Sequence, residues 1–211
     1  MSLEQFSLKN KTILITGASG DLGMQTAITL SKAGAKVIIT GRDEAKLNIT
    51  LNQLLGEGHT MFIADLTNEI SITELAQFCP DIHGVVHSAG MVEMFPTKFL
   101  NRKKIENTFE INFIAPILLM TALFRYKKIK QRSSIVFVSS LASEHPYASG
   151  AMYAASKTAL EAYSKVLAAE HINILLRSNS IAPAIIKSNL FEGTKAFVNT
   201  IRTDKNDHEK D

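Results

Sequence analysis

Short apolar runs alternate with longer amphipathic segments along most of the chain. The apolar runs predict strands at Thr12–Thr16, Lys36–Thr40, Thr60–Ile63, Gly84–His87, Ser134–Ser139 and Ile174–Ser180. A helical pattern occupies every interval between them, which favours an α/β fold with a parallel sheet and helices on both faces. Right-handed crossovers then predict a single doubly wound sheet of strand order 3-2-1-4-5-6. We expect one domain over residues 1–200 and a charged, disordered tail over 201–211.

A glycine-rich turn joins the first predicted strand to the first predicted helix. It runs Thr16-Gly17-Ala18-Ser19-Gly20-Asp21-Leu22-Gly23. Glycines let a backbone approach a pyrophosphate closely, and the first amides of a helix attract anions. Because the spacing departs from the usual G-x-G-x-x-G, and glycine clusters are common in turns, the turn by itself is only a moderately specific sign of a dinucleotide site.

A tyrosine and a lysine stand four residues apart in a later predicted helix, shortly after a serine pair. Tyr153 and Lys157 share one helical face, and Ser139 and Ser140 close the apolar run upstream. A neighbouring ammonium favours the phenolate, so we expect Lys157 to lower the pKa of Tyr153 toward a value useful in proton transfer. Taken alone, such a pair is more often a packed ring beside a solvated charge.

Together these motifs resemble the short-chain dehydrogenase/reductase family, over about Leu8 to Leu190. The residues that match the family's catalytic tetrad are Asn112, Ser140, Tyr153 and Lys157. The resemblance implies a Rossmann-like fold and NAD(P)-dependent transfer of a hydride between a nicotinamide and a ketone, aldehyde or alcohol. The chain is identified as a member with a short C-terminal part.

The resemblance also implies a role for each member of the tetrad. Ser140, which lies at the family's separation from the tyrosine, polarises the carbonyl, and Tyr153 delivers the proton. Lys157 holds the ribose hydroxyls, and Asn112 orients water in a relay to solvent. The structural alternatives are that the serine pair merely ends a strand and that Asn112 is a helix residue bonded to a backbone carbonyl.

The cofactor-binding residues follow from the same resemblance. Gly20 and Asp21 stand where the commonest subfamily has a small residue and a glycine, so the glycine spacing is closer to that of the nucleotide-sugar-modifying subfamily. Asp65 matches the aspartate beside the adenine ring, and His87–Gly90 is similar to Asn-Asn-Ala-Gly with both asparagines replaced. The full set is Gly17, Ser19, Gly20, Leu22, Gly23, Arg42, Asp65, Leu66, Ser88, Ala89, Gly90, Tyr153, Lys157, Pro183 and Ile186. No metal site is expected.

The end of the second predicted strand bears on cofactor choice. An acidic residue there accepts hydrogen bonds from the ribose of NAD and repels a 2′-phosphate. Gly41 occupies this place and Arg42 follows it; a guanidinium pairs with phosphate through two charge-assisted bonds. We therefore expect NADP to be preferred, with NAD possible. The alternative is that Arg42 is a surface residue before a helix capped by Asp43.

Composition adds limits on partners and location. The net charge of +3 is modest and its basic residues are dispersed, so nucleic acid is not implied. The apolar run Ile111–Leu123 is too short to span a bilayer and is expected to be a core helix. The N-terminus lacks the features of a secretory signal, so we expect a cytoplasmic protein without membrane contact. Cys79 is the only cysteine, which excludes an intramolecular disulfide.

The segment after Pro183 is shorter than in the family. Only Phe191–Ile201 supplies an apolar stretch, so we expect no seventh strand and an open edge at strand six. We expect a homodimer through the helices near Glu106–Arg125 and Ala151–Glu170. A poorly closed pocket with low or absent turnover is also expected.

The substrate side is expected to be mainly apolar and to take a small ketone or aldehyde. Its candidate residues are Leu141, His145, Tyr147, Met152, Ile185 and Leu190. One alternative is a non-catalytic dinucleotide-binding protein, favoured by the short C-terminal part and by Ala184 in place of the family's glycine. A less favoured alternative is a sugar-nucleotide-modifying enzyme, suggested only by the glycine spacing. Oxidation of NADPH or NADH by carbonyl compounds separates enzyme from binding protein.

Overall fold

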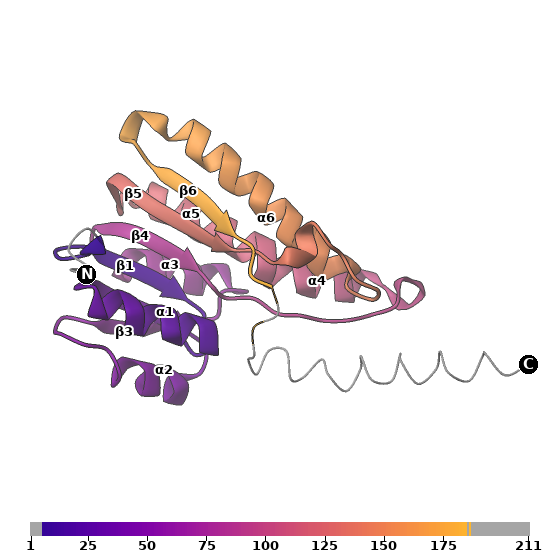
Figure 1. The fold of residues 1–211 in the computed structure, drawn as a ribbon, viewed down its shortest axis with the longest axis horizontal. Coiled ribbons are helices and arrows are strands. Elements are labelled where there is room, and N and C mark those ends of the chain that lie inside the picture. The colour runs from indigo at the N-terminus through magenta and orange to yellow at the C-terminus, as the bar shows by residue number, and fades with distance from the viewer. Residues whose placement is uncertain (1–5, 185, 187–211) are drawn as a thin grey trace, which may run out of the picture.

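A six-stranded parallel sheet organises the chain (Figure 1). The computed structural model describes residues 6–184 and 186. The strands are β1 (Thr12–Thr16), β2 (Lys36–Gly41), β3 (Thr60–Ile63), β4 (Ile82–His87), β5 (Ile129–Val138) and β6 (Arg177–Ile181). Their order β3-β2-β1-β4-β5-β6 confirms the predicted topology. The predicted tail 201–211 and the stretch Phe191–Ile201 lie outside the described residues.

Helices cover both faces of this sheet. They are α1 (Asp21–Lys32), α2 (Glu44–Leu51), α3 (Glu69–Phe78), α4 (Arg102–Phe109), α5 (Ala115–Arg125) and α6 (Ala151–Glu170). Ile13 and Ile15 of β1 pack with α1 and α2, whereas Leu14 packs in the larger core that includes α3, α5 and α6. Because both faces of β1 are buried, its sequence is continuously apolar rather than alternating.

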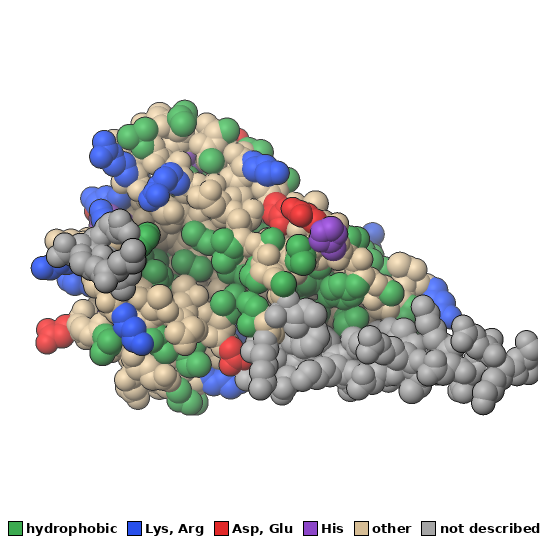
Figure 2. All heavy atoms as spheres, in the orientation of Figure 1, with side chains coloured by type: hydrophobic (Ala, Val, Ile, Leu, Met, Phe, Trp, Pro, Cys, Tyr) green, Lys and Arg blue, Asp and Glu red, His purple; other side chains and the backbone are tan. Residues whose placement is uncertain are grey.

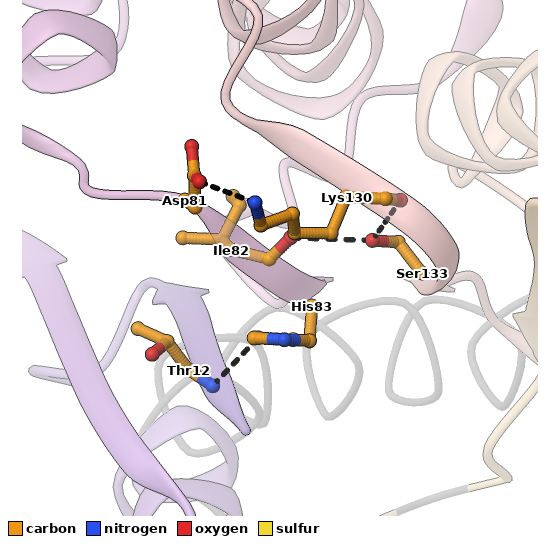
Figure 3. Close-up of polar contacts among 6 residues, drawn as sticks. All are labelled: Thr12, Asp81, Ile82, His83, Lys130 and Ser133. Carbon is orange, nitrogen blue, oxygen red and sulfur yellow. Dashed lines mark hydrogen bonds and ion pairs between the residues drawn. The ribbon is translucent and has the colours of Figure 1, made fainter. Parts of the chain in front are cut away.

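β5 begins earlier than the predicted Ser134. Ile82 pairs with Ile129, and the register then shifts so that Gly84 pairs with Ser134. The hydroxyl of Ser133 donates to the carbonyls of Ile82 at 3.2 Å and Lys130 at 2.7 Å, which satisfies the backbone inside the irregularity (Figure 3). Because residues Lys130 to Ser133 are polar, this part of the strand has no apolar run in the sequence.

The same end of the sheet carries two further polar contacts (Figure 3). Lys130 forms an ion pair with Asp81, and the backbone N–H of Thr12 donates to Nδ1 of His83 at 3.2 Å. Burial lowers the pKa of His83, which favours the neutral ring that can accept this bond. These contacts join the starts of β1, β4 and β5.

β6 begins later than the predicted Ile174. A 3₁₀ turn occupies Ile172–Ile174, and Leu175 has a φ of 55°. A branched residue in this left-handed region interrupts extended pairing, so β6 begins at Arg177. Within the described residues the sheet ends at this strand.

The most apolar helical segment belongs to the core of this fold. Among the described residues, Arg102–Arg125 is long and apolar enough to cross a membrane by length and composition alone. A π-helical turn, Glu110–Ile114, separates α4 from α5 within it. Leu119 and Leu123 are fully buried in the core shared with the sheet, so the predicted core helix Ile111–Leu123 packs as expected.

His87 is a neutral histidine at the end of β4. Its side chain is 2% exposed, and its ring stacks on Phe137 with centroids 4.7 Å apart. Within the described part of the chain its Nε2 atom has no hydrogen-bond partner. Burial lowers the pKa of His87 from 6.5 to about 3, because the imidazolium would lose its hydration without gaining a partner.

We predict that His87 makes the fold sensitive to mild acid. The unfolded chain takes up a proton near pH 6.5 and the folded chain only near pH 3, so stability falls as the pH drops through this window. His87→Phe keeps a ring without a titrating group. When the pH falls from 6.5 to about 5, the unfolding free energy of His87→Phe should decrease by about 2 kcal/mol less than that of the parent. Urea unfolding at both pH values measures this, with exposed His145→Phe as the control. Parallel losses in all three proteins would contradict it.

Candidate active site

A cleft of about 1240 Å³ opens at the carboxyl ends of the strands. The strand order reverses between β1 and β4, and ligands of such sheets bind at this position. The walls come from the β1–α1 turn, the ends of β2 and β4, the β5–α6 loop and the start of α6. Apolar side chains gather in the middle of the face shown in Figure 2.

The glycine turn forms one wall by packing directly against the end of β4. Gly17 has a φ of 68°, and a Cβ added there would lie 2.7 Å from the backbone of Ala89. A Cβ on Gly23 would lie 2.3 Å from the carbonyl oxygen of Gly17, whereas one on Gly20 would lie 3.5 Å from that oxygen, an ordinary contact. Packing within the protein therefore requires Gly17 and Gly23 but not Gly20.

The turn also presents the N-terminus of α1 to the cleft. Gly20 is the N-cap and supplies no side-chain hydrogen bond, and Gly20, Asp21, Leu22 and Gly23 all line the cleft. The partial positive charge of a helix N-terminus favours a phosphate. Beside it, the Thr16 hydroxyl accepts the N–H groups of Ser88 and Ala89, each at 3.2 Å. The backbone of the β1–α1 turn has no room for a Cβ at Gly17 or Gly23. Such a closely packed turn at a helix N-terminus fits the pyrophosphate of a dinucleotide.

Ser140, Tyr153 and Lys157 meet across the cleft from this turn. Burial raises the pKa of Tyr153, and its hydrogen bond with Ser140 acts in the opposite direction. Lys157 is 4% exposed; its Nζ atom donates to the carbonyl of Val138 at 2.8 Å and lies 5.7 Å from the centre of the Tyr153 ring. Burial lowers the pKa of Lys157 to about 8.

This arrangement differs from the expectation that Lys157 lowers the pKa of Tyr153. The ammonium is engaged by a carbonyl of β5, and the largest effect on the phenol is the cost of placing its charged form in a buried site. The buried pair therefore favours a neutral, protonated phenol. The spacing on the helix does not reveal this, because burial depends on loops distant in the sequence.

Asn112 lies behind the wall of the cleft rather than on it. Its side chain is fully buried on the π-helical turn; its Oδ1 atom accepts from the N–H of Met91 at 2.8 Å. Its Nδ2 atom donates to the carbonyl of Met91 at 3.0 Å and to the hydroxyl of Ser156 at 3.1 Å. Asn112 thus ties the β4–α4 loop to α6, and bonding to a backbone carbonyl is one of the alternatives that the sequence left open.

Most of the other predicted cofactor residues line the same cleft. They are Gly17, Ser19, Gly20, Leu22, Gly23, Arg42, Leu66, Ser88, Ala89, Gly90, Pro183 and Ile186. Asp65 is the exception: its exposed carboxylate accepts from the N–H and hydroxyl of Thr67, at 3.0 and 2.8 Å, and Ala64 and Leu66 form the wall on either side. The side chain of Asp65 is used to cap its own turn.

At the end of β2, Arg42 lines the cleft and Asp43 caps the helix that follows. Arg42 and Lys46 line the cleft, and a carboxylate oxygen of Asp43 accepts from the N–H of Lys46 at 3.0 Å as the N-cap of α2. The other carboxylate oxygen lies 3.5 Å from the Lys46 ammonium. Both carboxylate oxygens of Asp43 are therefore engaged by Lys46, and the cationic side chains of Arg42 and Lys46 face this end of the cleft.

The opposite end of the cleft is mainly apolar. Of the expected residues, Leu141, His145 and Tyr147 line it; Met152 does not, and Ile185 and Leu190 lie outside the described residues. Five residues that were not expected from the sequence also line the cleft: Met91, Val92, Met94, Ile111 and Ala148. Met91, Val92 and Met94 had a positional signal, because they lie within four residues after Gly90, just past the end of β4.

Comparisons with known proteins agree with this geometry. The family described as short chain dehydrogenase matches residues 11–199. L-xylulose reductase of Caenorhabditis elegans is 31% identical over 191 residues, covering 88% of this chain and 75% of that protein. The 3-oxoacyl-[acyl-carrier-protein] reductase FabG of Rickettsia felis (strain ATCC VR-1525 / URRWXCal2) is 30% identical over 183 residues, covering 87% and 76%.

A solved structure supports the same assignment. A short chain dehydrogenase/reductase family protein superposes with a TM-score of 0.84 at 26% identity, covering 90% of this chain and 80% of that one. The chain therefore belongs to the short-chain dehydrogenase/reductase family. It is a member of a family of oxidoreductases that act on CH–OH and C=O groups with NAD(P) cofactors.

We predict opposite outcomes for two alanine substitutions in the glycine turn. Gly23→Ala should destabilise the fold by about 1–3 kcal/mol, because its Cβ would overlap the Gly17 carbonyl and force the backbone to move. Gly20→Ala should stay close to the parent, since its Cβ meets only an ordinary contact. Thermal unfolding measures both, and Gly20→Ala is the matched control. Equal stability of the two variants would show that the turn is not closely packed.

Proposed function

We propose that the protein is an NADP-preferring oxidoreductase that interconverts small, mainly apolar ketones or aldehydes with their alcohols. One observation carries the proposal: Ser140, Tyr153 and the buried Lys157 line the same cleft as the glycine turn at the start of α1. A nicotinamide cofactor supplies or accepts the hydride when bound. The residues of this chain bind, orient and move the proton.

Proton transfer is assigned to the serine and tyrosine pair. The Ser140 hydroxyl and the Tyr153 phenol donate to one carbonyl oxygen, which polarises the bond and stabilises the alkoxide. Tyr153 then gives up its proton, and in the oxidative direction its phenolate takes that proton back. Because burial raises the pKa of Tyr153, the phenol is protonated at neutral pH and suited to reduction.

The remaining residues position the cofactor. The backbone of the glycine turn and the first amides of α1 would hold the pyrophosphate, and Ala89 and Gly90 line the cleft at the end of β4. Lys157 would bind the ribose hydroxyls, as the resemblance implies. Asn112 serves as a clamp on the Met91 backbone, which keeps the β4–α4 loop in place.

The preference for NADP rests on the charge at the end of β2. Arg42 and Lys46 face the cleft there, and the carboxylate of Asp43 is engaged by Lys46. A 2′-phosphate placed among these groups gains charge-assisted hydrogen bonds. An acid that would bind the ribose of NAD is replaced by Gly41.

The substrate class follows from the apolar end of the cleft. Met91, Met94 and Ile111 lie there with Leu141, and they favour a hydrocarbon group beside the reacting carbonyl. Tyr147 and His145 supply polar groups at the same end.

We also propose that the protein is cytoplasmic and forms a homodimer through α4, α5 and α6. Light scattering at micromolar concentration measures this oligomeric state.

We predict that Tyr153→Phe lowers kcat by about 10²–10⁴-fold, because the ring remains and the transferable proton is lost. The dissociation constant for NADPH should change by less than about twofold. Steady-state oxidation of NADPH with ketones, aldehydes and quinones, together with a cofactor-binding titration, measures both quantities. Tyr126→Phe is the control, since Tyr126 lies away from the cleft and accepts a hydrogen bond from Gln77. Near-parental turnover in Tyr153→Phe would remove the phenol from the mechanism.

The same assay addresses the non-catalytic alternative. A parent protein that binds NADPH and oxidises it with none of these compounds would be a binding protein rather than a reductase. Its affinity for the cofactor would then be unaffected by Tyr153→Phe, so the cofactor site and the chemistry are tested separately.

We predict that Arg42→Ala weakens NADPH binding by about 10–100-fold, the effect of losing charge-assisted hydrogen bonds to a phosphate. Binding of NADH should stay unchanged, because that cofactor lacks the phosphate. Fluorescence titration of both cofactors tests this, with Arg102→Ala as a control in which an exposed arginine loses only its ion pair to Glu106. Equal affinity of the parent for the two cofactors, unaltered by Arg42→Ala, would refute the assignment.

A further inference from the structure

A carboxylate on α6 holds the loop that carries Ser140. Glu161 lies one helical turn after Lys157. The hydroxyls of Ser139 and Ser143 both donate to its Oε1 atom, the second at 2.7 Å. These two serines stand on either side of Ser140 in the chain, so one carboxylate oxygen restrains the backbone before and after the proposed catalytic hydroxyl.

The rest of the loop converts this restraint into an orientation of Ser140. The carbonyl of Ser140 accepts from the N–H of Ser143 at 3.0 Å, and the Ser143 hydroxyl is also within 2.8 Å of it. The Oγ atom of Ser140 accepts from the N–H of Ala142 at 3.2 Å as the N-cap of a 3₁₀ turn. Accepting this bond leaves the Ser140 O–H available as a donor, and the Ser140 hydroxyl lies close enough to Tyr153 to lower the pKa of that phenol.

The charge of Glu161 makes these contacts stronger than neutral hydrogen bonds. An ionised acceptor roughly doubles the strength of a hydrogen bond. The side chain of Ser139 is 3% exposed, and its other acceptor, the Lys157 carbonyl, is 3.4 Å away. Removing the Glu161 carboxylate therefore leaves the buried Ser139 hydroxyl with only the distant Lys157 carbonyl as an acceptor. It also removes the restraint on the loop that carries Ser140.

We propose that Glu161 is a positioning residue that acts through Ser139 and Ser143 to aim the Ser140 hydroxyl at the oxygen of Tyr153 and at the substrate carbonyl. The inference rests on the proposed function, which makes Ser140 and Tyr153 the reacting pair. It adds to that function a residue that touches neither substrate nor cofactor.

The direct test follows the titration of Tyr153 rather than turnover. In protein labelled with carbon-13 at the tyrosine rings, comparison with Tyr153→Phe assigns the Tyr153 signal. Glu161→Leu should move its titration to higher pH, because the Ser140 hydrogen bond that favours the phenolate is lost. Glu161→Gln keeps an acceptor oxygen and should restore most of the parental titration. Unchanged titration in a folded Glu161→Leu protein would overturn the proposal.

A kinetic test separates positioning from a general loss of structure. Glu161→Leu should lower kcat at least about tenfold while KM stays within about twofold, which is the pattern of an interaction needed mainly in the transition state. In the Ser140→Ala background, Glu161→Leu should have no further effect, since residues that act through one another are not additive. Additive losses would overturn the proposal. Glu144→Leu is the control, an exposed acid of the same loop.

A second variant keeps the test decisive if Glu161→Leu does not fold. Ser143→Ala removes one donor and leaves Glu161 in place, and it should shift the Tyr153 titration in the same direction by a smaller amount. An unchanged titration in this variant would count against the proposal. If the parent shows no turnover with any carbonyl compound, the proposed function fails, while the titration still decides whether Glu161 orients Ser140.

Discussion

The close contact between the β1–α1 turn and the end of β4 is the constraint on which the site depends. Gly17 lets the turn lie against the Ala89 backbone, and Gly23 lets α1 pack against the Gly17 carbonyl. The Thr16 hydroxyl accepts from the N–H groups of Ser88 and Ala89. This contact sits where the strand order reverses. It brings the N-terminus of α1 to the cleft that α6 and the β5–α6 loop border on the other side.

Helix α6 is the second organising element, because it binds three segments that are distant in the chain. Ser156 holds Asn112 and through it the Met91 backbone, Lys157 binds the Val138 carbonyl, and Glu161 binds the serines around Ser140. The face of this helix that carries Tyr153 and Lys157 is thus bordered by polar contacts that are already formed within the protein. Such preorganisation is what electrostatic catalysis requires.

Burial shifts the pKa values of two side chains in the cleft, Tyr153 and Lys157. It raises the pKa of Tyr153 and lowers the pKa of Lys157 to about 8, so both side chains are shifted toward their neutral forms. At the other end of the cleft, Arg42 and Lys46 remain exposed and charged. The cleft therefore combines a buried pair of titratable groups with an exposed cationic end, and the proposed proton transfer and phosphate binding rest on this combination.

The strand order and most of the residues around the cleft could be predicted from the amino-acid sequence. Apolar runs, the glycine turn and the four-residue spacing of Tyr153 and Lys157 are local signals, and right-handed crossovers convert them into one topology. The shift of β5, the contacts of Asn112, the raised pKa of Tyr153 and the position of Glu161 beside Ser139 became known only from the folded chain. Each of these depends on burial or on hydrogen bonds between residues far apart in the chain, which no local pattern of residues encodes.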